Sequence, residues 1–205
     1  MSAAEKAARG YLGDGAVQVY TGNGKGKTTA ALGLAMRAVG RGLRVLMIQF
    51  MKRWGYGEHL AAGRLRPELS IVQVGKPYFV AREGEIDPET RASMGEDVRV
   101  FAPGSPPEEL VRGAEEGLAR AEWAMRERTA DIIILDEINV ALHFELVSLD
   151  RVLEVVRGRP DGVELVLTGR NAPEELLEVA DLVTEMREVK HYWRRGLGAR
   201  RGIEE

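Results

Sequence analysis

Short apolar runs alternate with helix-like segments along most of this chain. Six runs predict buried β-strands, at residues 16–20, 43–50, 70–74, 131–137, 163–168 and 181–186. The stretch from Ile132 to Leu135 is apolar at every position, which indicates a strand that is covered on both faces. Strands of this kind are typical of a parallel sheet between two layers of helices.

Helical patterns lie between these strands, at residues 27–40, 106–129, 148–157 and 173–180. The segment that begins at Pro106 has acidic residues in its first turn, as helix starts often do. One face of it is apolar at helical spacing, through Leu110, Ala114, Leu118, Ala121 and Met125. The sequence therefore predicts one α/β domain over residues 1–205, with a mainly parallel sheet of about six strands and helices on both faces.

Three segments fit this scheme poorly, namely residues 51–58, 75–105 and 187–205. Their glycine, proline, aromatic and basic content predicts loops at the carboxyl edge of the sheet, where such folds bind ligands. Loops that are merely solvated are the alternative. Residues 1–13 are expected to form an N-terminal arm with a short helix, and residues 187–205 a basic C-terminal tail.

Composition narrows the possible partners. The chain has 205 residues, 30% of them charged, and a formal net charge of −3, so no overall basic field favours nucleic acid or an anionic membrane. The absence of cysteine excludes disulfides, thiolate metal sites and a cysteine nucleophile. No apolar span approaches the ~18 residues of a membrane helix, and no leader pattern precedes the domain. These features predict a cytoplasmic protein.

A phosphate-binding loop follows the first strand. The usual pattern G-x-x-x-x-G-K-[ST] is present except that Thr21 replaces the first glycine. The loop and the start of its helix comprise Gly22, Asn23, Gly24, Lys25, Gly26, Lys27, Thr28 and Thr29. Its backbone N–H groups and the helix N-terminus would hold phosphates, Lys27 would reach their oxygens, and the Thr28 hydroxyl would bind Mg²⁺. A glycine-rich turn without a ligand is the alternative.

A second motif, Asp136-Glu137, ends the apolar strand at residues 131–137. An acid at this point binds or positions Mg²⁺ in many phosphate-loop proteins, while a helix N-cap is the competing role for Asp136. Combined with Lys27 and Thr28, the pair predicts a site for Mg-ATP or another triphosphate.

Several longer stretches resemble the ATP:corrinoid adenosyltransferases. They are GNGKGKTTAALG, LRVLMIQFMKRWGYGE, ILDEINVAL, LTGRNAPEELLEVADLVTEMREVKHYW and GLGARRGIEE, which together span most of the chain from about residue 17. Members of this family carry a similarly modified phosphate loop. The resemblance implies a homodimeric enzyme that transfers the 5′-deoxyadenosyl group of ATP to cobalt(I) of a corrinoid and releases intact triphosphate. It also implies Mg²⁺ or Mn²⁺, and a flavoprotein or other reductant that supplies cobalt(I).

The same resemblance assigns roles to individual residues. Gly22 to Thr28 would wrap the phosphates, Thr28 and Glu137 would bind Mg²⁺, and Asp136 would lie beside them. Nucleotide or substrate contacts are expected from Arg37, Arg170, His191, Arg194 and Arg195. For Arg37 and the tail residues a solvated side chain is the alternative, and for Arg170 it is helix capping.

One departure concerns the corrinoid. Many family members have a Gly-x-Gly-Phe-x-Trp stretch after the third strand, with aromatic side chains near the corrin ring. Here residues 75–83 read GKPYFVARE, so Tyr78 and Phe79 are the candidates and the tryptophan is missing. Trp54 and Tyr56 could offer apolar surface instead, or could only anchor their loop.

Two rival functions belong to other classes. A phosphate-loop ATPase or small-molecule kinase would act at the γ-phosphate, and a nucleotide- and corrinoid-binding carrier would not turn over. The first would need a residue that positions water or an acceptor hydroxyl, and no separate motif for either stands out. The nature of the phosphate product separates all three functions.

Overall fold

Six parallel strands form the main sheet of the computed structural model, which describes residues 12–52, 55–86, 88, 91–92 and 98–204. Their order is β3-β2-β6-β7-β1-β8, and every neighbouring pair is parallel. The strands are β1 (Val17–Thr21), β2 (Val45–Gln49), β3 (Leu69–Gln73), β6 (Ile132–Asp136), β7 (Glu164–Thr168) and β8 (Leu182–Glu185). Each overlaps one of the six predicted runs, so the α/β class and the parallel sheet are confirmed.

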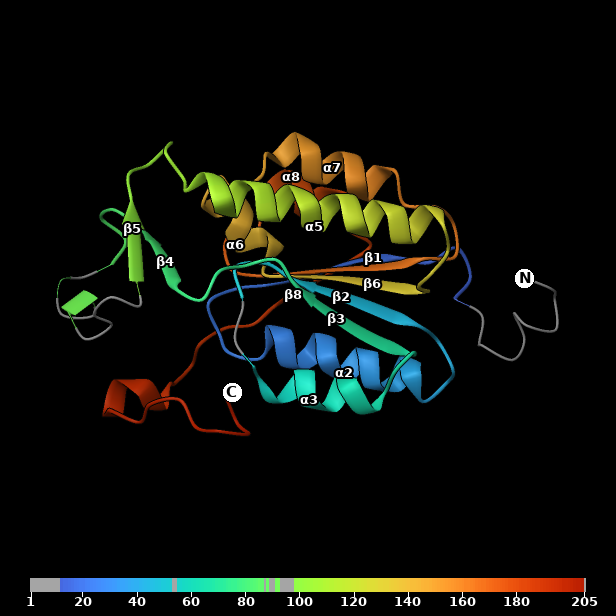
Figure 1. Ribbon diagram of the computed structural model, residues 1–205, viewed down its shortest axis with the longest axis horizontal. Helices are drawn as coiled ribbons and strands as arrows, with labels where there is room; N and C mark the ends of the chain where they lie inside the picture. Colours follow the sequence, from blue (N-terminus) through green and yellow to red (C-terminus); the bar gives the residue numbers. More distant parts are fainter. Residues whose placement is uncertain (1–11, 53–54, 87, 89–90, 93–97, 205) are drawn as a thin grey trace.

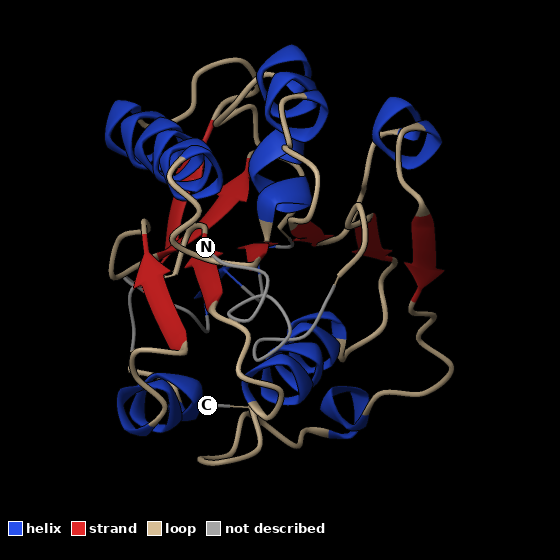
Figure 2. Ribbon diagram, turned by 90° about the vertical axis from the view of Figure 1, so that its right-hand side faces the viewer, coloured by secondary structure: helices blue, strands red, loops and turns tan. Residues whose placement is uncertain are grey.

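Two layers of helices enclose this sheet (Figure 1), and the turned view shows the strands between them (Figure 2). One layer consists of α2 (Lys27–Val39) and α3 (Gly57–Arg64). The other holds α5 (Glu108–Arg126), α6 (Ile138–His143), α7 (Leu149–Arg157) and α8 (Glu174–Glu178). None of the helices in the described part of the chain has the length and apolar character needed to span a membrane.

The apolar run of β6 explains how one strand serves two cores. Ile132 and Ile134 belong to the cluster that includes Ala31 of α2, whereas Ile133 and Leu135 belong to the cluster around α5 and α7. All four side chains are at most 1% exposed. The absence of polar alternation therefore reflects burial against helices on both faces.

The predicted apolar face of α5 is also confirmed. Leu110, Ala114, Leu118, Ala121 and Met125 are all buried. On the outer side of the same helix, the Trp123 side chain is 50% exposed. An amphipathic stripe of this kind fixes which side of a helix packs on the sheet.

The segments predicted as loops contain more regular structure than expected. Strands β4 (Phe79–Arg82) and β5 (Val98–Phe101) form a second, two-stranded parallel sheet, and α3 begins at Gly57. In the C-terminal tail, η2 (Tyr192–Arg195) is a short 3₁₀ helix. The loop prediction was wrong here because four-residue elements carry too little periodicity to be recognised. Of the predicted N-terminal arm, residues 1–11 lie outside the described residues.

Candidate active site

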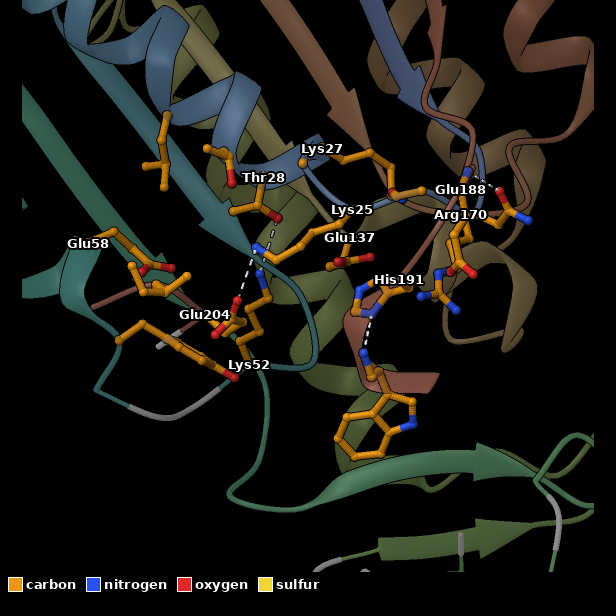
Figure 3. A pocket seen from close by; sticks show the side chains of 18 of the residues that line it. Lys25, Lys27, Thr28, Lys52, Glu58, Glu137, Arg170, Glu188, His191 and Glu204 are labelled. Carbon is orange, nitrogen blue, oxygen red and sulfur yellow. Dashed lines mark hydrogen bonds and ion pairs between the residues drawn. The ribbon is translucent and has the colours of Figure 1, made fainter. Parts of the chain in front are cut away.

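A cavity of about 890 Å³ opens at the carboxyl edge of the main sheet (Figure 3). The phosphate loop with the start of α2, the loop after β2 and the residues after β6 and β7 form one side of its wall. The C-terminal tail forms the rest of the wall. Among the predicted nucleotide contacts, every residue from Asn23 to Thr29 lines the cavity, as do Glu137 and Arg170. The carboxyl ends of the parallel strands thus bring the expected groups together.

The phosphate loop lies directly against the chain that follows β8. The N–H of Gly24 donates to the carbonyl of Met186 at 2.6 Å, and a Cβ on Gly24 would lie 2.6 Å from that oxygen. Any larger residue at position 24 would collide with the backbone there. Glycine at this position therefore allows the loop and the segment after β8 to form one wall.

Lys27 is folded back over the loop to which it belongs. Its ammonium group donates to the carbonyls of Gly22 and Gly24 at 2.6 and 2.7 Å. Burial lowers its pKa, and the carboxylates of Glu137 and Asp136 oppose that shift. An anion at the loop would give this buried cation the counter-charge that carbonyl oxygens do not supply.

Asp136 is a buried carboxylate with four hydrogen-bond partners. Its side chain is fully buried and accepts hydrogen bonds from Thr28 at 2.8 Å and Thr168 at 2.7 Å, both on Oδ1. Oδ2 accepts from Lys52 at 2.8 Å and Gln49 at 3.2 Å. These bonds account for its carboxylate oxygens, so Asp136 positions neighbouring groups. The cap position of α6 is held by Glu137, not by Asp136.

Glu137 combines an unusual backbone with a charged environment. Its φ of 67° places it in the left-handed region, and its N–H donates to the Thr168 hydroxyl at 3.0 Å. Burial and the neighbouring Asp136 raise its pKa, while Lys52, Lys27 and Arg170 act in the opposite direction. Non-glycine residues held in this region cluster at functional sites. The carboxylate faces the cavity between these cations (Figure 3).

The side-chain oxygen atoms of Thr28 and Glu137 suit a hard divalent cation, and Asp136 orients Thr28 beside them. Within the described ranges, no group of three or more His, Cys, Asp or Glu side chains could hold a metal ion by itself. Magnesium commonly binds through one or two carboxylates together with substrate phosphates. The donor set therefore fits Mg²⁺ that arrives with a nucleotide.

The C-terminal tail is fastened to the phosphate loop at two points. The N–H of Glu188 donates to the Asn23 side-chain oxygen at 3.1 Å, and Lys25 Nζ lies 3.9 Å from Glu204. Glu204 also accepts hydrogen bonds from Tyr192 and Arg200. Between these points the tail contributes to the cavity wall through Glu188, His191, Trp193, Arg194, Gly202, Ile203 and Glu204.

Comparison with known proteins agrees with this geometry. The family described as ATP:corrinoid adenosyltransferase BtuR/CobO/CobP matches residues 13–204. The chain belongs to this family. A corrinoid adenosyltransferase of Pseudomonas aeruginosa is 34% identical over 201 residues, which cover 98% of this chain and 88% of that protein. The corresponding proteins of Escherichia coli K12 and Salmonella typhimurium are each 32% identical, covering 93% of this chain and 85% of theirs.

The unusual first residue of the adenosyltransferase loop, Thr21, belongs to the sheet. It is the last residue of β1 and pairs with Glu185 of β8. Its hydroxyl accepts a hydrogen bond from the N–H of Ala172, at 3.3 Å, in the loop after β7. Threonine is favoured in a paired strand, and the Thr21 hydroxyl links the end of β1 to the loop after β7.

The predicted basic contacts differ in position. Arg170 lines the cavity, and so do His191 and Arg194 from the tail. Arg195 lies at a smaller neighbouring pocket, together with His191 and Arg194. Arg37 is exposed in the last turn of α2 and is not among the described residues that line the main cavity.

The four aromatic candidates for corrinoid contact also differ in their position relative to the cavity. Tyr56 lines the cavity, whereas Trp54 lies outside the described residues. Tyr78 and Phe79 belong to the β4 region and are absent from the described cavity wall. The Tyr78 hydroxyl donates to Glu109 of α5 at 2.8 Å, and the Arg99 guanidinium lies 4.2 Å from the ring centre. These contacts tie the two-stranded sheet to α5.

Sequence reasoning missed several groups in the wall. Lys52 follows β2 at the same sheet edge as Asp136, so strand order alone could have indicated it. Glu58 was within a segment predicted as loop, although the start of α3 carries it. Glu204 and Trp193 come from the tail, where no local pattern predicts a return to the phosphate loop.

Proposed function

We propose that this chain transfers the 5′-deoxyadenosyl group of ATP to the cobalt(I) of a corrinoid and releases inorganic triphosphate. The observation that carries the proposal is the family match over residues 13–204. The relatives from Pseudomonas aeruginosa and Escherichia coli, both named corrinoid adenosyltransferase, agree with it. A cavity of about 890 Å³ that is lined by a phosphate loop supports the nucleotide half of the reaction.

The proposed reaction needs no side chain as a general acid or base. Cobalt(I) supplies an electron pair to the ribose C5′, a cobalt–carbon bond forms, and the C5′–O bond breaks. The electron pair of that bond leaves with triphosphate, so no proton has to be removed from the nucleophile. The protein must then align the two substrates and stabilise the charge of the leaving group.

The cations of the cavity suit this leaving group. Lys25, Lys27, Lys52, Arg170 and Arg194 all line it. In our proposal Lys27 and the loop N–H groups hold the triphosphate, and Thr28 and Glu137 bind the accompanying Mg²⁺. Asp136 orients Thr28 through the 2.8 Å hydrogen bond. Magnesium bound there would neutralise part of the triphosphate charge.

The remaining contacts, to ATP from the arginines and to the corrinoid from the aromatic residues, are proposed from fewer observations. Arg170 supports the triphosphate from the end of β7, and the Arg37 contact rests on family resemblance alone. For the corrinoid, Tyr56 has the better support because it lines the cavity. The resemblance favours Tyr78 and Phe79 as well. It is also the sole basis for a homodimer and for a flavoprotein or other reductant as the source of cobalt(I).

The test of this function follows the corrinoid. The purified protein is incubated under anaerobic conditions with Mg-ATP and chemically reduced cob(I)alamin. The products are separated by chromatography and identified by mass spectrometry. Formation of the 5′-deoxyadenosyl corrinoid at a rate proportional to enzyme is expected. A reaction without ATP and one with Lys27→Ala serve as controls. An unmodified corrinoid in the presence of folded protein would contradict the proposal.

A further inference from the structure

The side chain of Lys52 occupies a central place in the candidate site. It enters the cavity from the loop after β2, next to β6 in the sheet (Figure 3). Its Nζ lies 2.8 Å from Oδ2 of Asp136 and 3.5 Å from the Thr28 hydroxyl. One ammonium group thus contacts both Thr28, a proposed ligand of Mg²⁺, and the carboxylate that orients it.

The backbone around Lys52 is built to hold it there. The preceding residue, Met51, has a left-handed φ of 57°. A Cβ on Gly75 would lie 2.3 Å from the backbone nitrogen of Lys52, so only glycine allows the loop after β3 to pass this close to the Lys52 backbone. The N–H of Gly75 donates to the Lys52 carbonyl at 3.2 Å. Residues of two neighbouring strand ends therefore cooperate to place this ammonium.

The charges around Lys52 explain what it does without a nucleotide. Asp136 is fully buried, and a buried carboxylate without a cation nearby is strongly unfavourable. The Lys52 ammonium pairs with this carboxylate at 2.8 Å, and the Glu137 carboxylate lines the same cavity. Lys52 is therefore a cation next to two carboxylates.

We propose that Lys52 holds the cation position beside Asp136 and Thr28 while no nucleotide is bound, and turns to the triphosphate when Mg-ATP enters. The inference rests on the proposed function, because it assumes that the cavity binds a triphosphate. In the first state the ammonium group competes with free divalent cations for the same oxygens. In the second it is a positioning cation for the leaving group, opposite Lys27.

This double role predicts effects of opposite sign. Removing the charge of Lys52 frees Asp136 and Glu137, so divalent cations alone should bind more tightly. The same change removes a cation from the triphosphate, so the metal–nucleotide complex should bind more weakly. A purely structural lysine would weaken both or leave both unchanged.

The experiment measures Mn²⁺ binding through the electron paramagnetic resonance signal of free Mn²⁺, which decreases as the ion binds. It is done without and with a non-hydrolysable ATP analogue. We compare the wild type with Lys52→Met and Lys52→Gln. Both variants should bind Mn²⁺ alone about tenfold more tightly, and Mn²⁺ with nucleotide about tenfold more weakly, than the wild type. Lys52→Gln keeps a hydrogen-bond donor for Asp136 and serves if Lys52→Met does not fold.

Two further variants serve as controls for the loss of charge at Lys52. Lys52→Arg keeps the charge and should retain weak binding of Mn²⁺ alone. Lys25→Met is the matched control, because Lys25 lines the same cavity but pairs with Glu204. It should change the binding of Mn²⁺ alone less than about twofold, because its ammonium group pairs with Glu204 of the tail and makes none of the contacts to Asp136 and Thr28 that Lys52 makes.

The inference is overturned if the uncharged variants shift both binding curves in one direction or leave both at the wild-type position. Failure of the proposed function gives a different result. In that case the wild type forms no adenosylated corrinoid, while the measurement with Mn²⁺ alone still reports on Lys52 and Asp136.

Discussion

The hydroxyl of Thr28 donates a hydrogen bond to Oδ1 of Asp136 at 2.8 Å, joining the first turn of α2 to the end of β6. Thr168 of β7 donates to the same oxygen at 2.7 Å. The phosphate loop and the proposed Mg²⁺ site are therefore connected through one buried carboxylate. Changes to its two threonine partners separate binding of the metal from stability of the fold.

We expect Thr28→Val to lower adenosyl transfer by at least about tenfold and to raise the Mg²⁺ concentration needed for half-maximal rate. The reason is that the variant removes a proposed metal ligand, while Asp136 keeps Thr168, Gln49 and Lys52. A Mg²⁺ titration of the initial rate measures this. A curve that matches the wild type would assign Thr28 to structure alone.

Thr168→Val is the matched substitution on the other side of Asp136. It leaves the N–H of Glu137 without the Thr168 oxygen that accepts its hydrogen bond. Loss of such a partner costs about 1–3 kcal/mol, so the free energy of unfolding should fall by that amount. Urea unfolding measures it, and a stability loss larger for Thr28→Val than for Thr168→Val would contradict this division.

Substitution of the aromatic residues discriminates between two surfaces for the corrinoid. Tyr56 lines the cavity, and Phe79, whose side chain is 47% exposed, lies on β4. We expect Tyr56→Leu to raise the KM for the corrinoid several-fold, because one aromatic contact contributes on the order of 1 kcal/mol. Phe79→Leu should have the smaller effect. The reverse order, measured with preformed cobalt(I), would place the corrin ring over β4.

The tail should depend on Glu204 for its place on the cavity. Glu204 accepts hydrogen bonds from Tyr192 and Arg200 and lies near Lys25. Glu204→Ala removes all three contacts, so trypsin should cut the tail several-fold faster at its arginines. The melting temperature should hardly change, because residues 187–204, the described part of the tail, contribute no side chain to the buried core. Unchanged cleavage would show that other contacts hold the tail.

A pair between the outer helices gives a pH-dependent prediction. Arg151 of α7 donates two hydrogen bonds to Glu122 of α5, at 2.7 and 2.5 Å. The Arg151 hydrogen bond holds the pKa of Glu122 below its usual 4.5, so folding favours the ionised form. The stabilisation is present above that pH and is lost as the pH falls through the lower, folded value.

Glu122→Gln should therefore reduce the free energy of unfolding at pH 7 by about 0.5–1 kcal/mol, a modest value because the pair is partly exposed. The difference from the wild type should close as the pH falls from about 5 towards 3. Thermal unfolding across this range measures it, with Glu116→Gln, an exposed position on the same helix, as control. A difference that persists at low pH would contradict the account.

The strands and the nucleotide loop were predictable because their signals are local. An uninterrupted apolar run such as residues 132–135 indicates a strand covered on both faces, and burial of all four side chains confirms it. The glycine, lysine and threonine pattern of the loop depends on phosphate geometry, which is the same wherever it occurs.

Other parts depend on contacts between distant segments, which no short pattern contains. The tail reaches the phosphate loop through Glu204 and Lys25, at opposite ends of the chain. Tyr78, expected near the corrinoid from resemblance, has its hydroxyl bound by Glu109 of α5. Lys52 lies beside Asp136 because β2 and β6 are neighbours in the sheet, and the sequence of neither strand contains that pairing.

The most direct test of the central claim is the identity of the phosphate product, followed by phosphorus-31 nuclear magnetic resonance. The protein is incubated with Mg-ATP and cob(I)alamin until the corrinoid is consumed. We predict inorganic triphosphate in an amount equal to the adenosylated corrinoid, with no ADP beyond that in a protein-free control. Orthophosphate with ADP, or ADP with a phosphorylated acceptor, would mean that the loop serves chemistry at the γ-phosphate and would contradict the account.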